Sequence, residues 1–213
     1  PPDILDLYLG SLESLGFEVL GGCGLTETAP ILAFSPRGRR WRDTAGKPIE
    51  GVESRIAVGE TPEIQARGPN VFAGYWRNPE KTAAEFRPDG FFVTGDLGSF
   101  DAQGYLTISG RGKDLVISGG FNVYPKEIEL EIDRLPEVVE SAVIGVPHAD
   151  MGEGVTAVVV LKAGHAQFDE RGMIAALQKR LAKFKVPKRI IAVPELPRNA
   201  MGKVQKSLLR QTY

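Results

Sequence analysis

The sequence GRGKDLVISGGFNVYPKEIE, residues 110–129, decides the fold of this chain. Its β-like runs on either side of Gly119 and Gly120 predict a hairpin that turns at the two glycines. Pro125 follows the hairpin, and proline is favoured at the first position of a helix because its missing N–H has no partner there. We therefore expect a strand pair followed by a helix.

The charged residues just before this hairpin predict a swivel. Arg111 and Lys113 each follow a glycine, and glycine relaxes the backbone because it lacks a Cβ atom. We therefore expect two domains, residues 1–110 and residues 111–213, with a swivel in the charged segment that contains Lys113.

Short β-like runs separated by glycine and proline turns fill most of the first domain. This pattern is typical of a small antiparallel barrel or sandwich. The expected strands are residues 54–58, 63–67, 91–94 and 105–109. Nearer the start of the chain, residues 4–15 predict a helix and residues 17–20 a buried strand.

The second domain has a mixed pattern that predicts a compact α+β fold with a central sheet. Two β-branched runs, residues 138–146 and 155–161, are long enough for central strands. Three helices are expected, one from Pro125, one capped by Asp169 and a last one over residues 206–212. The residues expected on their buried faces are Ile128, Ile132, Leu135, Met173, Leu177 and Leu181. A further strand is expected over residues 190–193.

The composition is that of a globular protein. Of the 213 residues 42% are hydrophobic and 25% are charged, and the net charge is −1, so we expect no affinity for nucleic acid. The single cysteine, Cys23, excludes an internal disulfide framework and a cysteine-based zinc site. No apolar run approaches the roughly 20 residues of a membrane span. A cytoplasmic protein without a membrane partner is expected.

The segment GLTET, residues 24–28, has residue types suited to binding a phosphate. Small residues allow backbone N–H groups to approach the phosphate, a threonine hydroxyl can donate to it, and a carboxylate can hold Mg²⁺. An ordinary turn after a strand would explain the same five residues.

Two more segments carry a single charged residue of interest. In FFVTGDLG, residues 91–98, we expect Asp96 to lie in an exposed turn, where it could cap its own loop or accept the two hydroxyls of a ribose. In RNAMGKV, residues 198–204, Lys203 is expected on a loop. It could be a plain surface lysine or a mobile cation that neutralises charge developing on phosphorus.

These motifs together resemble those of the adenylate-forming enzymes, the superfamily of acyl-CoA synthetases, peptide-synthetase adenylation domains and luciferases. The motifs occur in the family's order over nearly the whole chain. The segment GYWRNPEKT, residues 74–82, is similar to a further family segment that we expect to be structural. The resemblance implies ATP and a carboxylic acid as substrates, Mg²⁺ as the metal and CoA as co-substrate.

The resemblance also implies a role for individual residues. Lys203, Thr26 and Glu27 would be catalytic, and Glu27 would bind the metal. The residues that would contact ATP or AMP are Gly22, Cys23, Thr26, Thr28, Asp96, Arg111 and Lys203. The residues that would line a tunnel for CoA are Ser118, Gly119, Gly120 and Phe121. The family usually has an adenine-stacking aromatic residue where this chain has Cys23, so that contact would be made differently here.

The implied reaction forms an acyl-adenylate and then an acyl-CoA thioester. Within the family, the passages after residue 110 are most similar to malonyl-CoA synthetases, so malonate or a related small carboxylic acid is the expected substrate. Ala29 and Pro30 are more typical of general acyl-CoA synthetases, which leaves the acyl group open. A peptide-synthetase-type adenylation domain and a non-catalytic binding or regulatory fragment remain alternatives.

The family's phosphate-gripping loop, which is rich in Ser, Thr and Gly and ends in Pro-Lys-Gly, does not occur in these residues. Most of the family's large N-terminal domain is also lacking. We therefore expect residues 1–110 to be the end of that large domain and residues 111–213 to be the mobile lid domain. Alone, this chain is expected to be a truncated and inactive portion, and the missing half could come from another chain.

Overall fold

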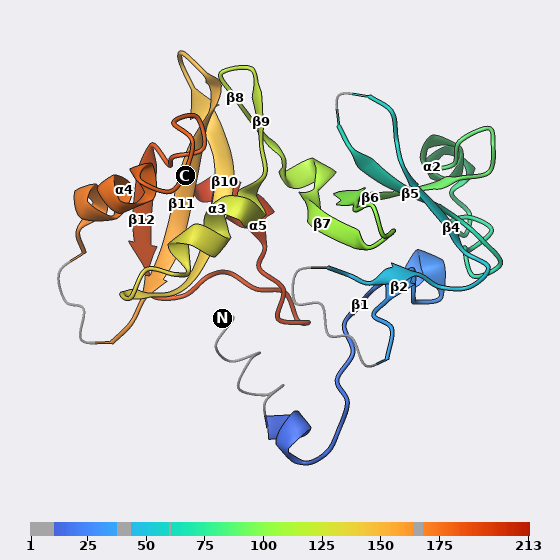
Figure 1. The fold of residues 1–213 in the computed structure, drawn as a ribbon. Coiled ribbons are helices and arrows are strands. Elements are labelled where there is room, and N and C mark those ends of the chain that lie inside the picture. The colour runs from blue at the N-terminus through green and yellow to red at the C-terminus, as the bar shows by residue number, and fades with distance from the viewer. Residues whose placement is uncertain (1–10, 38–43, 60, 164–167) are drawn as a thin grey trace. The chain divides into compact units, whose positions relative to one another are not determined.

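A computed structural model describes residues 11–37, 44–59, 61–163 and 168–213. Within them the chain forms two compact units that meet in sequence between Lys113 and Asp114. We call residues 11–113 the β unit and residues 114–213 the α+β unit (Figure 1). The mixed α+β fold class expected from the sequence is confirmed.

The β unit consists of two antiparallel sheets with strand orders β1-β2-β3 and β4-β5-β6-β7. Its elements are β1 (Gly22–Cys23), the 3₁₀ turn η1 (Thr26–Thr28), β2 (Ala33–Phe34), β3 (Lys47–Pro48), β4 (Glu53–Ile56), β5 (Glu63–Arg67), α2 (Pro79–Glu85), β6 (Phe92–Phe100) and β7 (Leu106–Arg111). A second 3₁₀ turn, η2 (Gly112–Asp114), follows β7. The sheet β4-β5-β6-β7 is the antiparallel β structure that the short β-like runs between glycine and proline turns predict.

Two groups of apolar side chains hold the β unit together. The first joins the two sheets and contains Leu32, Ala33, Val52, Ile64, Ala66 and Leu106. The second is a cluster of rings in which Phe72 contacts Tyr75, Phe86 and Phe92 with centroid distances of 4.8, 5.6 and 5.3 Å. This second cluster packs the GYWRNPEKT segment and α2 against β6, because Phe92 is a β6 residue that is 1% exposed.

The α+β unit is built on one sheet with the strand order β10-β11-β8-β9, in which β12 also pairs with β11. Its elements are β8 (Val116–Ser118), β9 (Phe121–Val123), α3 (Pro125–Ile132), β10 (Val138–His148), β11 (Gly152–Leu161), α4 (Glu170–Gln178), β12 (Arg189–Val193) and α5 (Lys206–Thr212). Among the described strands of this sheet, the β11–β12 pair is parallel and the other pairs are antiparallel. The predicted hairpin at Gly119 and Gly120, the helix at Pro125 and the last helix over 206–212 are confirmed.

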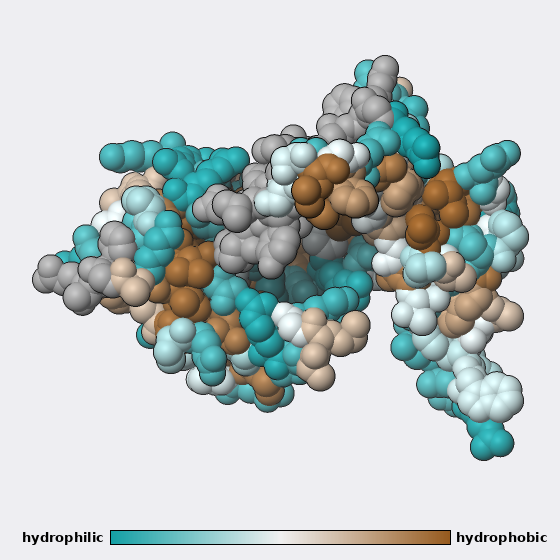
Figure 2. All heavy atoms as spheres, turned by 90° about the horizontal axis from the view of Figure 1, so that it is seen from below, coloured by the Kyte–Doolittle hydropathy of each residue, from teal (hydrophilic) through white to brown (hydrophobic). Residues whose placement is uncertain are grey.

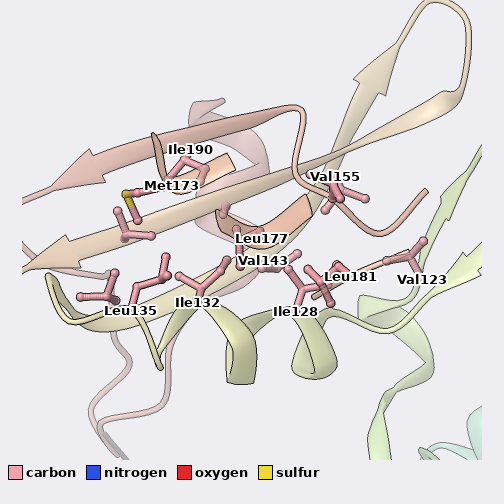
Figure 3. Close-up of a cluster of buried hydrophobic side chains, with 14 of the residues drawn as sticks. Val123, Ile128, Ile132, Leu135, Val143, Val155, Met173, Leu177, Leu181 and Ile190 are labelled. Carbon is pink, nitrogen blue, oxygen red and sulfur yellow. The ribbon is translucent and has the colours of Figure 1, made fainter. Parts of the chain in front are cut away.

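Both faces of β10 and β11 carry buried apolar side chains, which explains why the middle of each strand is rich in valine and alanine. Val143 and Val155 face the core that contains α3 and α4, and Figure 3 shows their side chains among those of the two helices. The residues of β10 and β11 that alternate with these point to the opposite face, because successive side chains along a strand point to opposite sides. Thus Ala142 and Val158 pack with Leu209 of α5 on the opposite face.

The helices of this unit begin and bury their apolar faces as expected. Asp169 caps α4, because its Oδ1 accepts a hydrogen bond of 2.9 Å from the backbone N–H of Gly172. Ile128 and Ile132 of α3 and Leu177 of α4 are fully buried, and they meet beneath the sheet (Figure 3).

Two expectations for the β unit were wrong. Phe17–Leu20 does not form a buried strand, because no β ladder includes these residues and Phe17 is 61% exposed. Asp96 does not lie in an exposed turn. The residue is buried within β6, since the pairing of β6 with β7 continues past the apolar run that suggested the strand. The helix expected over residues 4–15 lies partly outside the described residues, and residues 11–14 are helical.

The surface carries hydrophobic side chains in both units. On the face seen in Figure 2 they lie in separate groups between hydrophilic residues. The most exposed of the large ones with a ring is Trp76 of the GYWRNPEKT segment, at 88%. No helix among the described residues is both long and apolar enough to cross a membrane.

Candidate functional site

The loop that contains Thr26, Glu27 and Thr28 is closed by its own last residue. The backbone N–H of Leu25 donates to the Thr28 hydroxyl oxygen over 3.1 Å, and this hydroxyl lies 3.1 Å from the carbonyl oxygens of Leu25 and of Pro30. Thr28 is fully buried, whereas Thr26 is exposed. The Thr28 side chain thus builds the loop, and Thr26 is the threonine whose hydroxyl is open to a ligand.

Glycine is required in this loop by close packing. A Cβ atom on Gly24 would lie 1.6 Å from the carbonyl oxygen of Pro30, and one on Gly22 would lie 2.7 Å from the ring of Phe34. Both distances are below van der Waals contact, so a side chain at Gly24 would displace the backbone at Pro30, and a side chain at Gly22 would displace the Phe34 ring. This packing explains the glycines without a ligand, and their predicted contact with ATP stays a prediction.

Glu27 is held by a residue of the GYWRNPEKT segment. The Tyr75 hydroxyl lies 3.1 Å from Glu27 Oε1 and 2.6 Å from Glu85 Oε2, and the backbone N–H of Phe72 donates to the Glu27 carbonyl oxygen over 2.9 Å. Burial raises the pKa of Tyr75 above its ordinary value, and the hydrogen bonds to Glu85 and Glu27 raise it further. The phenol therefore keeps its proton and can donate it to a carboxylate.

The residues around Glu27 fit Mg²⁺ only in company with a phosphate ligand. Among the described residues no group of three or more His, Cys, Asp or Glu side chains could hold a metal ion. Mg²⁺ is commonly bound by one or two carboxylates together with substrate phosphates and water, rather than by a cage of protein ligands. The oxygen donor of Glu27, fixed by Tyr75, suits that arrangement.

Asp96 and Arg111 form the second part of the candidate site. They are direct partners across β6 and β7, and Arg111 Nε lies 2.8 Å from Asp96 Oδ1. The aspartate side chain is 10% exposed and the arginine side chain 48% exposed. The backbone N–H of Asp96 also donates to the hydroxyl of Thr94 over 3.1 Å. The structure thus brings together the two residues that the sequence assigned to a ribose and its phosphate.

Cys23 is close enough to this pair to be influenced by its charges. Burial and, second to it, the negative charge of Asp96 raise the pKa of the Cys23 thiol to about 11, against the opposing effect of the Arg111 guanidinium. The thiol is therefore protonated at neutral pH and offers a small apolar surface beside the Asp96–Arg111 pair.

The residues predicted to line a CoA tunnel lie at the β8–β9 hairpin of the α+β unit. Gly119 and Gly120 have φ values of +58° and +81°, which a turn of this kind requires of them. Phe121 is 54% exposed and its ring stacks on that of Phe184 at a centroid distance of 4.6 Å. Ser118 is fully buried, and its hydroxyl has no hydrogen-bond partner in the described part of the chain.

The hairpin is fixed to the central sheet by a carboxylate. Glu153 of β11 accepts a hydrogen bond of 2.8 Å from the backbone N–H of Ile117, and Gly119 N–H donates to the Met151 carbonyl oxygen over 2.9 Å. These hydrogen bonds hold the backbone of the hairpin that carries the exposed ring of Phe121.

Lys203 lies on an exposed turn between β12 and α5, as predicted. Its ammonium group has no ion-pair partner among the described residues. Lys113 lies in the 3₁₀ turn η2, the last residue of the β unit. The predicted ligands of ATP are thus divided between the two units, since Lys203 belongs to the α+β unit and the others to the β unit.

The sequence analysis missed the residues that support Glu27. Tyr75 was taken as part of a structural segment, yet its hydroxyl contacts Glu27, which is 48 positions away in the sequence, and also contacts Glu85. Asn70 was also missed, and its side-chain amide donates to the carbonyl oxygens of Thr28 and Ile31 over 2.8 and 2.7 Å. The only signal was the clustering of polar residues in an otherwise aromatic segment.

Comparison with known proteins identifies the class to which this chain belongs. Residues 127–203 match the model of the AMP-binding enzyme C-terminal domain, and the match ends at Lys203. The chain belongs to the adenylate-forming, AMP-binding enzymes, as its motifs indicated.

Several relatives within this class are acyl-CoA ligases. An indoleacetate–CoA ligase of Aromatoleum aromaticum is 40% identical over 88% of this chain and 38% of its own length. A 2-succinylbenzoate–CoA ligase of Geobacillus kaustophilus is 42% identical over 95% of this chain and 43% of its own length. The solved structure of ATP-bound MatB from Rhodopseudomonas palustris is 57% identical, with a TM-score of 0.87 over 93% of this chain and 41% of that one. This chain thus spans less than half the length of these relatives.

Proposed function

We propose that these residues are part of an ATP-dependent, AMP-forming acyl-CoA synthetase. The observation that carries the proposal is the Asp96–Arg111 pair, which offers a ribose-accepting carboxylate and a phosphate-binding guanidinium side by side in a chain that has several CoA ligases among its relatives. Small carboxylic acids are the proposed substrates, with malonate first, because the passages after residue 110 resemble malonyl-CoA synthetases.

In the first half-reaction, a substrate carboxylate attacks the α-phosphorus of ATP, and pyrophosphate leaves. Asp96 would accept hydrogen bonds from the ribose hydroxyls, and Arg111 would hold a phosphate oxygen. Glu27 would ligate Mg²⁺, which neutralises phosphate charge when it is bound. The Lys203 ammonium would stabilise the charge that builds up on the phosphoryl oxygens in the transition state.

In the second half-reaction, the CoA thiol attacks the acyl-adenylate and AMP leaves. The proposal requires Lys203 to withdraw and the β8–β9 hairpin, with Phe121, to approach the adenylate. A rotation at Lys113 would move Lys203 away from the adenylate and bring the β8–β9 hairpin to it, because the backbone of the turn η2 connects the units.

The test of the first half is the variant Lys203→Ala in an enzyme that carries these residues together with an acyl-binding domain. We expect ATP–pyrophosphate exchange to slow by roughly 10²–10³, the effect of losing one charge-stabilising group. Lys183→Ala removes another exposed lysine of the same unit and is the matched control. An exchange rate that does not change in Lys203→Ala would contradict the proposal.

The test of the hinge is Lys113→Pro in the same enzyme. Proline fixes φ, so we expect it to stiffen the turn, spare pyrophosphate exchange and stop thioester formation. Equal loss of both half-reactions would reject Lys113 as the hinge.

The acyl group is tested by exchange with a panel of malonate, longer dicarboxylates, fatty acids, aromatic acids and amino acids. Highest exchange with malonate supports the specific proposal, and highest exchange with an amino acid would point to a peptide-synthetase-type adenylation domain.

Calorimetry of this 213-residue chain with ATP and with CoA examines the non-catalytic alternative, since binding of either ligand would show that a site is present in these residues alone.

A further inference from the structure

The turn that carries Lys203 is a closed hairpin and not an open loop. Arg198 and Val204 form an antiparallel β-bridge. Inside it, the backbone N–H of Asn199 donates to the Lys203 carbonyl oxygen, and the N–H of Gly202 donates to the Asn199 carbonyl oxygen, each over 2.9 Å. Gly202 has a φ of +76°, which favours glycine at this corner.

The side chain of Asn199 fills the centre of this hairpin. Its Oδ1 atom accepts hydrogen bonds from the backbone N–H groups of Met201 and of Lys203, over 3.0 and 2.9 Å. One amide oxygen thus fixes the backbone nitrogen of Lys203 and that of the residue two positions before it. Asparagine commonly closes turns in this way.

Arg198 attaches the hairpin to the central sheet. Its Nη1 atom donates to the carbonyl oxygen of Gly202 over 2.6 Å, and its Nη2 atom forms an ion pair with Glu140 of β10. The guanidinium group therefore bridges the tip of the hairpin and a strand that contributes Ala142, Val143 and Ile144 to the core.

The chain after the hairpin is anchored as well. The backbone N–H of Gln205 donates to the Pro197 carbonyl oxygen over 2.8 Å. Lys206, the first residue of α5, forms an ion pair of 2.6 Å with Glu129 of α3, and these side chains are only 17% and 9% exposed. Both ends of the hairpin are therefore held by the core of the α+β unit.

We propose that Asn199 and Arg198 are positioning residues for Lys203. They fix the backbone of Lys203 before any ligand binds, so that only its own side-chain torsions have to be ordered on the phosphate. Exposed loops are usually mobile, and a displaced catalytic group loses about 10²-fold in rate for 1 Å of error. This inference rests on the proposed role of Lys203 in adenylation.

The first test uses this chain alone and measures amide hydrogen exchange at Met201 and Lys203. Asn199→Leu has nearly the same shape but no acceptor, so we expect exchange of both amides to become at least about tenfold faster. Asn199→Asp keeps the acceptor oxygen and should restore protection. Gln205→Ala is the control, because the Gln205 side chain does not cap α5. Unchanged protection in Asn199→Leu would overturn the proposal.

The second test measures pyrophosphate exchange in the enzyme that also carries an acyl-binding domain. Asn199→Leu should lower kcat by roughly tenfold with little change in the KM for ATP, because the lost positioning acts in the transition state. Asn199→Asp should recover most of the rate. The thioester-forming half-reaction, measured from added acyl-adenylate, should be unaffected.

A double variant separates positioning from any other role. If Asn199 acts only through Lys203, the variant Asn199→Leu/Lys203→Ala should be no slower than Lys203→Ala. Additive losses would reject the positioning role and leave the proposed function intact. If Lys203→Ala itself exchanges at the normal rate, the proposed function fails, and the hydrogen-exchange result still decides whether Asn199 holds the turn.

Discussion

The β unit and the α+β unit hold their charged candidate residues in opposite ways. In the β unit the side chains themselves are tied down, since Asp96 is paired with Arg111 and Glu27 lies against Tyr75. In the α+β unit the backbone around Lys203 is tied down by Asn199 while its ammonium is left exposed. The first arrangement suits a site that receives a ligand in a set pose, and the second suits a cation that has to enter and leave such a site.

The largest expected effects test whether the two units are independent folding units. Phe92→Ala in the β unit and Leu177→Ala in the α+β unit each empty a fully buried position, and each should destabilise its own unit by about 3–5 kcal/mol. Hydrogen exchange followed by mass spectrometry on peptides from both units would measure this. Faster exchange throughout the chain in either variant would show that the two units unfold together, and would reject their independence.

A smaller effect is expected from the buried ion pair that seats α5. Lys206→Met should lower the free energy of unfolding of the α+β unit by about 3 kcal/mol, because it leaves the Glu129 carboxylate buried without its cation. Arg134→Ala removes a more exposed partner of Glu131 in the same unit and should change the stability by less than about 1 kcal/mol. Denaturant titration checks both. Equal effects would show that burial does not distinguish the two pairs.

The support of Glu27 is tested by Tyr75→Phe, which removes only the hydroxyl. We expect the β unit to lose about 1–2 kcal/mol, since a partly buried hydrogen bond to a carboxylate disappears. Glu85→Gln keeps an acceptor for the phenol and should have the smaller effect of the two. A Tyr75→Phe protein that unfolds at the wild-type denaturant concentration would show that the hydroxyl does not fix Glu27.

The smallest effect concerns the protonation of Cys23. With a pKa of about 11, its alkylation rate should keep rising tenfold per pH unit well above pH 9, where an ordinary thiol levels off. Asp96→Asn removes a charge that raises this pKa and should make the thiol more reactive at a given pH, whereas Arg111→Ala should make it less reactive. Iodoacetamide labelling at a series of pH values measures all three proteins.

The same shift predicts the direction of a stability change. The folded thiol binds its proton more tightly than the unfolded thiol, whose pKa is near 9.0. The contribution of this thiol to the free energy of unfolding is therefore complete below pH 9 and is lost between pH 9 and about 11. Replacing Cys23 by Ala should remove that loss, and denaturant titration across this pH range would detect it.

The sequence predicted the elements that depend on local pattern. The bounds of β5 and of α5 agree with the structure, because Pro62 and Gly68 flank β5 and the polar Gln205 precedes α5. The hairpin at Gly119 and the helix at Pro125 were also predictable, since each rests on the backbone preference of one residue type.

The long-range features could not be predicted in this way. Asp96 is buried because β7 pairs with β6 beyond the apolar run, and a polar residue in a strand gives no periodic signal of that pairing. The contact of Tyr75 with Glu27 depends on the ring cluster around Phe72, which forms only when α2 packs on β6. The hairpin around Lys203 is different, because an asparagine followed by Gly202 is a local turn signal that we did not use.

The cross-strand pairing of Asp96 with Arg111 has a consequence for how this family segment can change in evolution. Side chains alternate between the two faces of a sheet, so a single inserted or deleted residue between these positions and the turn at Asp101–Gly104 would send one of the two to the opposite face. Length changes there should be tolerated only when a bulge, like the register shift already present at Leu97 and Gly98, absorbs the extra residue. The β6–β7 ribbon should therefore accept substitutions far more readily than changes in length.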